Sequence, residues 1–180
     1  MAVTSIWPVK SRLDHVINYA RNPAKTRERS LVAQASLHAI DNVIEYAADT
    51  IKTEERAYVS CLNCREDDAA AQMMETKRYW GKPDGRLCFH GYQSFVEDEV
   101  TPQIAHEIGI KLAKELWGDR FQIIVATHID KKSHIHNHFV LNSVSILDGY
   151  RYNDCKVTYR KMRETSDRLC REYGLSVLEN

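Results

Sequence analysis

The sequence has little that would place the chain in a membrane or outside the cell. Its 180 residues contain no apolar run approaching the ~18 residues that a transmembrane helix requires. The first residues lack a basic region followed by an apolar stretch, so no signal peptide is predicted. Five cysteines are few, and odd in number, for a disulfide-bonded scaffold. These absences predict a cytoplasmic protein with free thiols and no membrane segment.

A surplus of either charge is also missing. The chain has 25 basic and 25 acidic residues. Nucleic-acid-binding domains usually carry a basic excess, so the bulk charge gives no support for such a partner, although a local basic patch would suffice. The hydrophobic content of 43% is ordinary for a soluble domain. The length predicts one domain spanning residues 1–180.

Strand and helix patterns intermix along the chain, which predicts an α+β fold. The apolar segments 120–127 and 134–146 are close in sequence and predict an antiparallel hairpin within a central sheet flanked by helices. The other expected strands are 2–9, 57–62 and 86–90. The expected helices are 11–21, 31–48, 66–80, 101–117 and 157–173. The helix over 101–117 begins with Thr101 as a capping residue and a proline in its first turn.

Four of the eight histidines fall within eleven residues, at His128, His134, His136 and His138. Alternate side chains of a strand share a face, so His134, His136, His138 and Asn142 point to one side. If the two apolar segments pair, His128 at the end of the first lies alongside. We therefore predict that His128, His136 and His138 bind one divalent metal ion and leave coordination positions open for a substrate. We expect His134, at the mouth of the loop, to line the site without binding the metal.

Two further features bear on metal binding. Asp130 follows His128 by two residues and is predicted to accept a ring N–H and fix a histidine tautomer, unless it only forms a turn. A competing set combines Cys61-x-x-Cys64 with Cys88 and His90, residue types that suit structural zinc. The second pair lacks the usual C-x-x-C spacing, so the histidine cluster is the favoured site.

An internal repeat places two tyrosines in similar surroundings. Segments 16–26 and 43–53 share the pattern V-I-x-Y-A-x4-K-T, which contains Tyr19 and Tyr46. One interpretation is two amphipathic helix ends with partly buried tyrosines. The other is two phenols beside cations that suit a phosphate, contributed by Arg21, Lys25 and Lys52.

These segments resemble a known family. The run T-H-x-D…H-x-H-N-H-F-x-x-N-S-V resembles the three-histidine motif of conjugative relaxases, the mobilisation nucleases of plasmids and integrative elements, within the wider histidine-hydrophobic-histidine (HUH) endonucleases. Y-x-x-N-P-x-K-T at 19–26 resembles their tyrosine motif, and F-H-G-Y-Q-S-F at 89–95 their middle motif. V-T-P-x-x-A-H-E-I-G at 100–109 and S-D-R-L-C-R-E-Y-G-L-S-V at 166–177 also match, so the resemblance runs along the whole chain.

The resemblance implies an HUH-endonuclease-like fold and a bacterial enzyme that nicks one DNA strand at a transfer origin. In that family a tyrosine hydroxyl attacks the scissile phosphate, stays linked to the 5′ end and leaves a free 3′-OH. The position after the first strand favours Tyr19 as the nucleophile, with Tyr46 as its rival or as a second nucleophile. Imidazole ligands suit Mn²⁺ or Zn²⁺, and Mg²⁺ is compatible at cellular abundance. Ser94 is placed near the site by the resemblance alone.

The implied partners are single-stranded DNA at a transfer origin, accessory DNA-binding proteins and a coupling or secretion apparatus. Single-stranded DNA is bound by cations interleaved with aromatic rings. Candidates of these types, beyond Arg21 and Lys25, are Arg27, Arg29, Lys77, Arg78, Tyr79, Trp80, Lys82, Arg151, Tyr152, Lys156 and Arg160. Two other functions stay open: a non-catalytic metal- and DNA-binding module that specifies an origin, and a replication initiator with the same chemistry.

Overall fold

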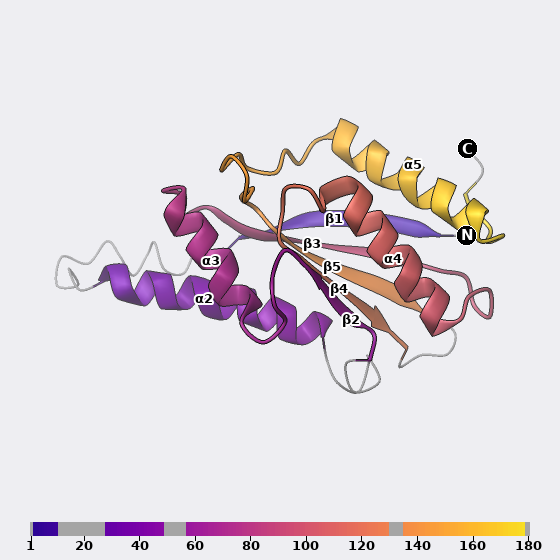
Figure 1. Cartoon of the computed structure of the whole chain (residues 1–180), viewed down its shortest axis with the longest axis horizontal. Coiled ribbons are helices and arrows are strands. Elements are labelled where there is room, and N and C mark those ends of the chain that lie inside the picture. The colour runs from indigo at the N-terminus through magenta and orange to yellow at the C-terminus, as the bar shows by residue number, and fades with distance from the viewer. Residues whose placement is uncertain (1, 11–27, 49–56, 130–134, 179–180) are drawn as a thin grey trace.

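A computed structural model describes residues 2–10, 28–48, 57–129 and 135–178. In this part of the chain, five strands form one antiparallel sheet in the order β1-β3-β5-β4-β2 (Figure 1). The strands are β1 (Val3–Lys10), β2 (Val59–Leu62), β3 (Arg86–Ser94), β4 (Ile123–His128) and β5 (His136–Asn142). The helices are α2 (Glu28–Ala47), α3 (Ala69–Tyr79), α4 (Pro102–Trp117) and α5 (Lys156–Glu172). The predicted α+β fold is confirmed; the helix expected over 11–21 lies outside the described residues.

The helices cover both faces of the sheet and enclose two cores. Val140 of β5 packs against α2 and α3, through residues such as Ile40 and Met73. Its neighbours Phe139 and Leu141 point to the opposite face, where α4 and α5 close a second core. This alternation along β5 follows the predicted one. The β4–β5 hairpin is also confirmed, because all six residues of β4 pair antiparallel with β5.

Strand β3 is longer than the sequence predicted. The pattern suggested a strand over 86–90, whereas β3 continues through Gly91 to Ser94. A Cβ atom on Gly91 would lie 2.9 Å from the carbonyl oxygen of Ser5, so the glycine marks a close approach of β1 rather than a break. The extension matters for the site because it brings Ser94 directly opposite His136.

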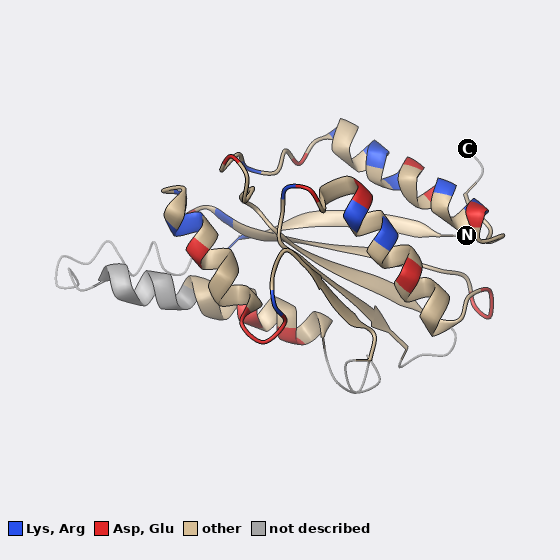
Figure 2. Ribbon diagram, viewed as in Figure 1, with Lys and Arg blue, Asp and Glu red and all other residues tan. Residues whose placement is uncertain are grey.

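Charged residues lie mainly on the helices and loops (Figure 2). The strands contain only Lys10 and Arg86 among the Lys, Arg, Asp and Glu residues, both near the same end of the β1–β3 pair. The sheet therefore presents faces without any carboxylate. None of the helices that the structure describes combines the length and apolar character of a membrane span.

Candidate functional site

Three histidines converge at one end of the central hairpin. His128 is the last residue of β4, and it pairs directly with His136, the first residue of β5. His138 follows two residues later and projects from the same face. One ring nitrogen of each histidine lies within 4.8 Å of those of the other two. The structure thus brings together the three residues that the strand alternation singled out, in an arrangement that could hold one metal ion.

The second ring nitrogens of two of these histidines have protein partners. Nε2 of His128 lies 2.7 Å from the carbonyl oxygen of Ala47. A carbonyl only accepts, so this nitrogen carries the proton and Nδ1 of His128 keeps the lone pair that a metal requires. Nδ1 of His138 lies 2.9 Å from Nε2 of His90, which leaves Nε2 of His138 for the metal side. Such outer contacts are the usual means of fixing the tautomer and orientation of a metal-binding imidazole.

His90 and Ala47 are functional neighbours that the sequence analysis missed. His90 was considered only as a partner of Cys88 in a zinc site, yet it lies on β3 with its ring stacked on His138 at a centroid distance of 5.0 Å. Burial, followed by the Coulombic interaction with His128, lowers the pKa of His90 to about 4. His90 is therefore neutral at physiological pH. Its place in the F-H-G-Y-Q-S-F motif was the available signal; a backbone carbonyl such as that of Ala47 gives none.

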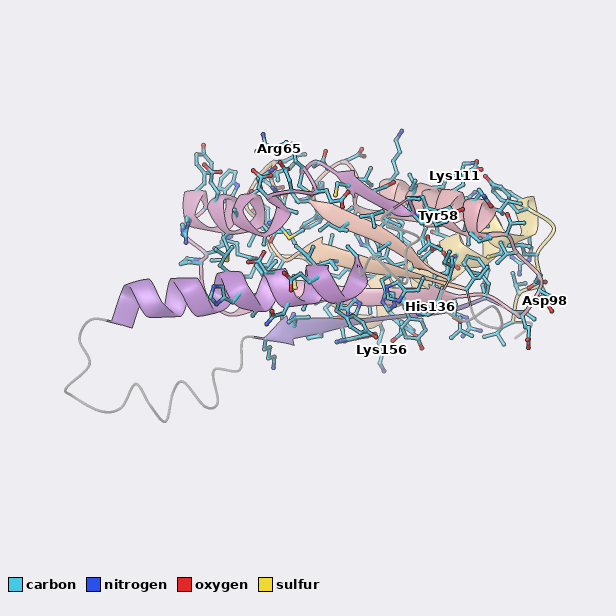
Figure 3. All side chains as sticks on the ribbon, turned by 90° about the horizontal axis from the view of Figure 1, so that it is seen from below. Tyr58, Arg65, Asp98, Lys111, His136 and Lys156 are labelled. Carbon is cyan, nitrogen blue, oxygen red and sulfur yellow. The ribbon has the colours of Figure 1, made fainter. Side chains whose placement is uncertain are left out.

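Tyr46 lies against the histidines from the last turn of α2. Its ring centroid is 5.7 Å from that of His138, 6.0 Å from that of His128 and 6.1 Å from that of His90. The tyrosine is 53% exposed, so one side of it packs on the imidazoles while the other side meets solvent. Viewed from below, His136 lies beside this end of α2 (Figure 3). Of the two repeated tyrosines, the structure brings Tyr46 to the cluster, whereas Tyr19 lies outside the described residues.

Ser94 also lies at the cluster. It is directly opposite His136 in the β3–β5 pair, so the two side chains share a face of the sheet. Ser94 is half-buried. The placement expected from the family resemblance is therefore present, and the longer β3 is its structural cause.

Asn142 is not brought to the cluster. It shares a face with His136 and His138 but lies at the other end of β5. Its Nδ2 donates to Oε1 of Gln122 at 2.7 Å and to the carbonyl oxygen of Met73 at 3.2 Å. Asn142 is six positions further along the strand than His136, a distance of roughly 20 Å. Other predicted site residues lie outside the described chain: Asp130, His134, Arg21, Lys25 and Lys52.

The expectation that Lys77 and Tyr152 contact DNA is wrong. Lys77 is fully buried and its Nζ donates to Oγ of Ser143 at 2.5 Å. Burial lowers the pKa of Lys77 to about 7. Tyr152 is 8% exposed and packs edge-on against Phe89 in the core. Lys77 cannot reach a nucleic acid, and the ring of Tyr152, although it lines a cavity with Arg86 and Arg151, is too deeply buried for a base to stack on it.

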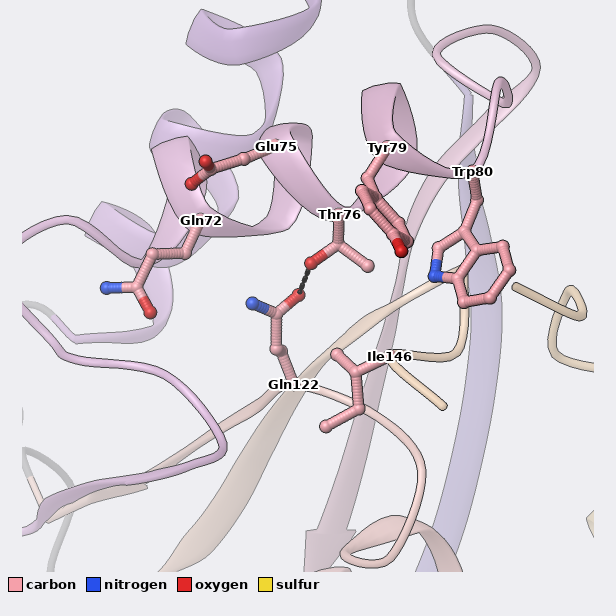
Figure 4. Close-up of a pocket in the computed structure, with 7 residues that line it drawn as sticks. All are labelled: Gln72, Glu75, Thr76, Tyr79, Trp80, Gln122 and Ile146. Carbon is pink, nitrogen blue, oxygen red and sulfur yellow. Dashed lines mark hydrogen bonds between the residues drawn. The ribbon is translucent and has the colours of Figure 1, made fainter. Parts of the chain in front are cut away.

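Two other DNA-binding candidates surround a separate hollow. Tyr79 and Trp80 line a cavity with Gln122 and Ile146, at the end of β4 away from the histidines (Figure 4). Thr76 donates to Oε1 of Gln122 at its floor. This hollow is therefore distant from the histidine cluster.

The alternative cysteine-based zinc site is not assembled. Cys61 lies on β2 and Cys88 on β3, and two strands separate these strands in the sheet. At the spacing of neighbouring strands this is roughly 14 Å. Within the described ranges, the three histidines are the group of residues that could hold a metal ion.

Comparisons with known proteins agree with this geometry. Residues 46–175 match the model of the family described as relaxase, MobA/VirD2-like, nuclease domain. Protein rlx of Staphylococcus aureus is 39% identical over 120 residues, which cover 67% of this chain and 38% of that protein. The group II intron-interrupted relaxase LtrB of Lactococcus lactis subsp. cremoris is 30% identical over 94% of this chain and 33% of its own length. The matched segments thus cover only about a third of each of these relatives.

Proposed function

The chain belongs to the MobA/VirD2-like relaxase family, whose nuclease domain it matches, and we propose that it nicks one strand of DNA by covalent attack of Tyr46. The observation that carries the proposal is the packing of the Tyr46 ring on His128 and His138 at the end of α2. The scissile phosphate of a DNA strand bound at this place would contact both the phenol and the metal-binding imidazoles. Tyr46 takes precedence here over Tyr19, because its ring contacts the cluster.

The proposed step is a transesterification. The Tyr46 hydroxyl oxygen forms a bond to the scissile phosphorus as the bond from phosphorus to the 3′ oxygen breaks. The hydroxyl loses its proton to solvent and the departing 3′ oxygen gains one, so the products are a 5′-phosphotyrosine and a free 3′-OH. Since one phosphodiester replaces another, the step can run backwards and reseal the strand.

The chain positions the reacting groups through consecutive residues of α2. Tyr46 presents the phenol, and the carbonyl oxygen of Ala47 accepts the hydrogen bond from His128. Any shift of the last turn of α2 would therefore move the nucleophile and disturb a metal-binding ring together. The strands of the site contribute no carboxylate that would repel a phosphate.

The donor set fits one divalent ion, for which we propose Mn²⁺, Zn²⁺ or Mg²⁺. His128 would bind through Nδ1 and His138 through Nε2, with His136 as the third ligand. Three neutral imidazoles favour Mn²⁺ or Zn²⁺ over Mg²⁺, which prefers oxygen ligands. Once bound, the ion supplies polarisation of the phosphoryl oxygens and neutralises charge that develops there.

The proposed substrate is single-stranded DNA at a transfer origin. The match covers only 38% of protein rlx and 33% of LtrB. Recruitment to an origin, accessory DNA-binding proteins and a coupling apparatus are therefore proposed for a whole relaxase. The nicking chemistry is the part that the residues described here can support.

A covalent adduct tests the proposal without knowledge of the origin sequence. The protein is incubated with Mn²⁺ and a single-stranded DNA library that contains a random region, and adducts that survive a denaturing gel are sequenced. We expect a shifted band that contains one preferred DNA site and disappears with a chelator. Tyr46→Phe removes only the attacking oxygen and should abolish the band, while Tyr150→Phe, an exposed tyrosine elsewhere, should not.

Tyr19→Phe separates the two nucleophile assignments. If Tyr46 attacks, Tyr19→Phe keeps adduct formation. Loss of the adduct in Tyr19→Phe with its retention in Tyr46→Phe would reverse the assignment. A wild-type protein that binds DNA but forms no adduct with any library member would instead favour the non-catalytic binding module.

A further inference from the structure

The face of the sheet that carries the histidines continues onto β1 as a surface with exposed aromatic rings. Directly opposite residues in an antiparallel pair project from the same face. Trp7 is opposite His90, and Ser5 is opposite Tyr92. Tyr92 is in turn opposite His138. We call the surface formed by Ser5, Trp7, Tyr92 and Ser94 the aromatic shelf.

Ring contacts link the shelf to the histidine cluster. The centroid of Trp7 lies 4.9 Å from that of His90 and 6.0 Å from that of Tyr92. His90 stacks on His138, so rings follow one another from the edge strand to the predicted metal site. One strand, β3, lies between β1 and β5, so these two strands are roughly 10 Å apart. A ligand on Trp7 would therefore lie next to whatever occupies the cluster.

The shelf is open where the rest of this face is closed. Val140 and Ile124, which lie in the same row across the sheet as Trp7 and His90, are fully buried beneath α2 and α3. Trp7, by contrast, is 40% exposed, and Tyr92 and Ser94 are half-buried. An indole of this size, fixed by strand pairing and by contacts on one side, presents a rigid apolar surface to solvent.

The strands of the shelf lack carboxylates, and two cations lie near the outer edge of β1. No strand of the sheet contains Asp or Glu. At the outer edge of β1, the hydroxyl of Tyr159 donates to the carbonyl oxygen of Thr4 at 2.8 Å, which fixes the first turns of α5 beside the shelf strand. These turns carry the exposed cations Lys156 and Arg160, the latter 3.7 Å from Glu164.

We propose that the aromatic shelf binds unpaired nucleobases of the DNA strand, by stacking on Trp7 and Tyr92 beside the phosphate held at the histidine cluster. The proposal rests on the proposed function, since it assigns the neighbouring stretch of the same substrate. A DNA strand whose phosphate reaches the histidine cluster must place its adjoining bases nearby. Bases stack on aromatic rings such as Trp7 and Tyr92, and the surrounding β-strands have no carboxylate that would repel the DNA backbone. Stacking tolerates any base, so the shelf contributes affinity without fixing the sequence.

Binding of oligo(dT) to metal-free protein tests the shelf separately from catalysis. The probe is a labelled oligo(dT) of about 20 nucleotides, longer than the roughly 4–16-nucleotide sites of single-strand binders. Trp7→Ala should weaken binding roughly 5- to 150-fold, the loss of one stacked base. Trp7→Phe keeps a ring and should lose less. Tyr150→Ala is the matched control, because this tyrosine is 69% exposed but lies away from the shelf, beside Lys82.

Tryptophan emission gives an independent readout. In a Trp80→Phe background the remaining indoles are the exposed Trp7 and Trp117, which is 4% exposed. Oligo(dT) should quench this emission. An abasic strand of equal length offers phosphates without bases and should quench little. The abasic strand should also bind to Trp7→Ala and to the wild type with equal affinity.

Two results would contradict the proposal that the aromatic shelf binds bases. One is oligo(dT) affinity in Trp7→Ala and Trp7→Phe equal to that of the wild type. The other is an equal loss of affinity for oligo(dT) and the abasic strand, which would indicate a general effect on the fold or on phosphate binding. The proposed function fails by a different result, the absence of any Tyr46 adduct in the wild type, and that outcome leaves base stacking on Trp7 measurable.

Discussion

The two faces of the β4–β5 hairpin differ although their residues alternate along the same strands. On one face His128, His136 and His138 converge as like groups around a shared point. On the other face Thr127 and Asn137, directly opposite each other, are closed into hydrogen bonds with neighbours of complementary chemistry. On the first face, the imidazole nitrogens offer lone pairs to a cation. On the second face, the polar groups of Thr127 and Asn137 form hydrogen bonds with other groups of the protein. The difference separates a site for a ligand from a scaffold that spaces it.

The scaffold face carries a chain of hydrogen bonds across the sheet. The hydroxyl of Thr127 donates to Oδ1 of Asn137 at 2.6 Å, so Nδ1 of His106 must donate to Thr127. Nε2 of His106 then accepts from the hydroxyl of Ser60 on β2. Asn137 donates to Oε1 of Gln93 on β3. Four strands are thereby held in register, and this register sets the spacing of the histidines on the opposite face.

The largest effect should come from the ligand face. His138→Ala removes one of three imidazoles, and we expect metal affinity to fall by more than the ~10–100-fold typical of an outer contact. The urea unfolding midpoint of the metal-free protein should stay close to that of the wild type. Isothermal titration with Mn²⁺ and urea unfolding in chelator measure the two quantities. His38→Ala, an exposed histidine of α2, is the control; equal affinities in both variants would exclude His138 as a ligand.

The scaffold face should respond in the opposite way. Asn137→Ala leaves the buried hydroxyl of Thr127, Oε1 of Gln93 and the carbonyl oxygen of Ala105 without this partner. Each unsatisfied buried group costs about 1–3 kcal/mol, so we expect a loss of at least about 2 kcal/mol in the free energy of unfolding. Urea unfolding measures it, with the exposed Asn42→Ala as control. Unchanged stability would show that the network does not hold the register.

His90 tests the boundary between the faces, because it touches a ligand without being one of the three. His90→Phe keeps a ring against Trp7 and Tyr46 but removes the nitrogen that bonds Nδ1 of His138. We expect metal affinity to fall by ~10–100-fold at nearly unchanged stability. His90→Gln restores a polar partner and should recover part of the affinity. Equal affinities in wild type and His90→Phe would mean that this hydrogen bond does not orient His138.

The sequence predicted the ligand face better than the surroundings of the site. The period-two spacing of His136 and His138, followed by the core residues Phe139 and Leu141 on the opposite face, was enough to place both imidazoles on one face. The prediction for His128 followed from an adjacent strand. Longer-range geometry had no such signal. The carbonyl of Ala47 is reached through the packing of α2, and the strand predicted to end at His90 continues to Ser94.

Side-chain chemistry alone also misled the prediction of DNA contacts. Lys77, near a helix end, was a candidate DNA contact, but it is buried with Ser143 as its partner. Its burial depends on the packing of α3 against the sheet, which helical spacing does not reveal. Trp7, which the sequence placed simply as an aromatic residue within a strand, became informative only when β1 proved to be the exposed edge beside β3.

The smallest effect we predict concerns the helix that supports the scaffold face. Thr101 caps α4 by accepting from the backbone N–H of Ile104, and α4 carries His106 of the network. Thr101→Ala removes the cap and should cost about 1 kcal/mol of unfolding free energy, whereas Thr101→Ser should cost little. Metal affinity should stay unchanged in both, because the cap is remote from the imidazoles. If Thr101→Ala weakened metal binding as strongly as His90→Phe, the two faces would have to be treated as one coupled unit.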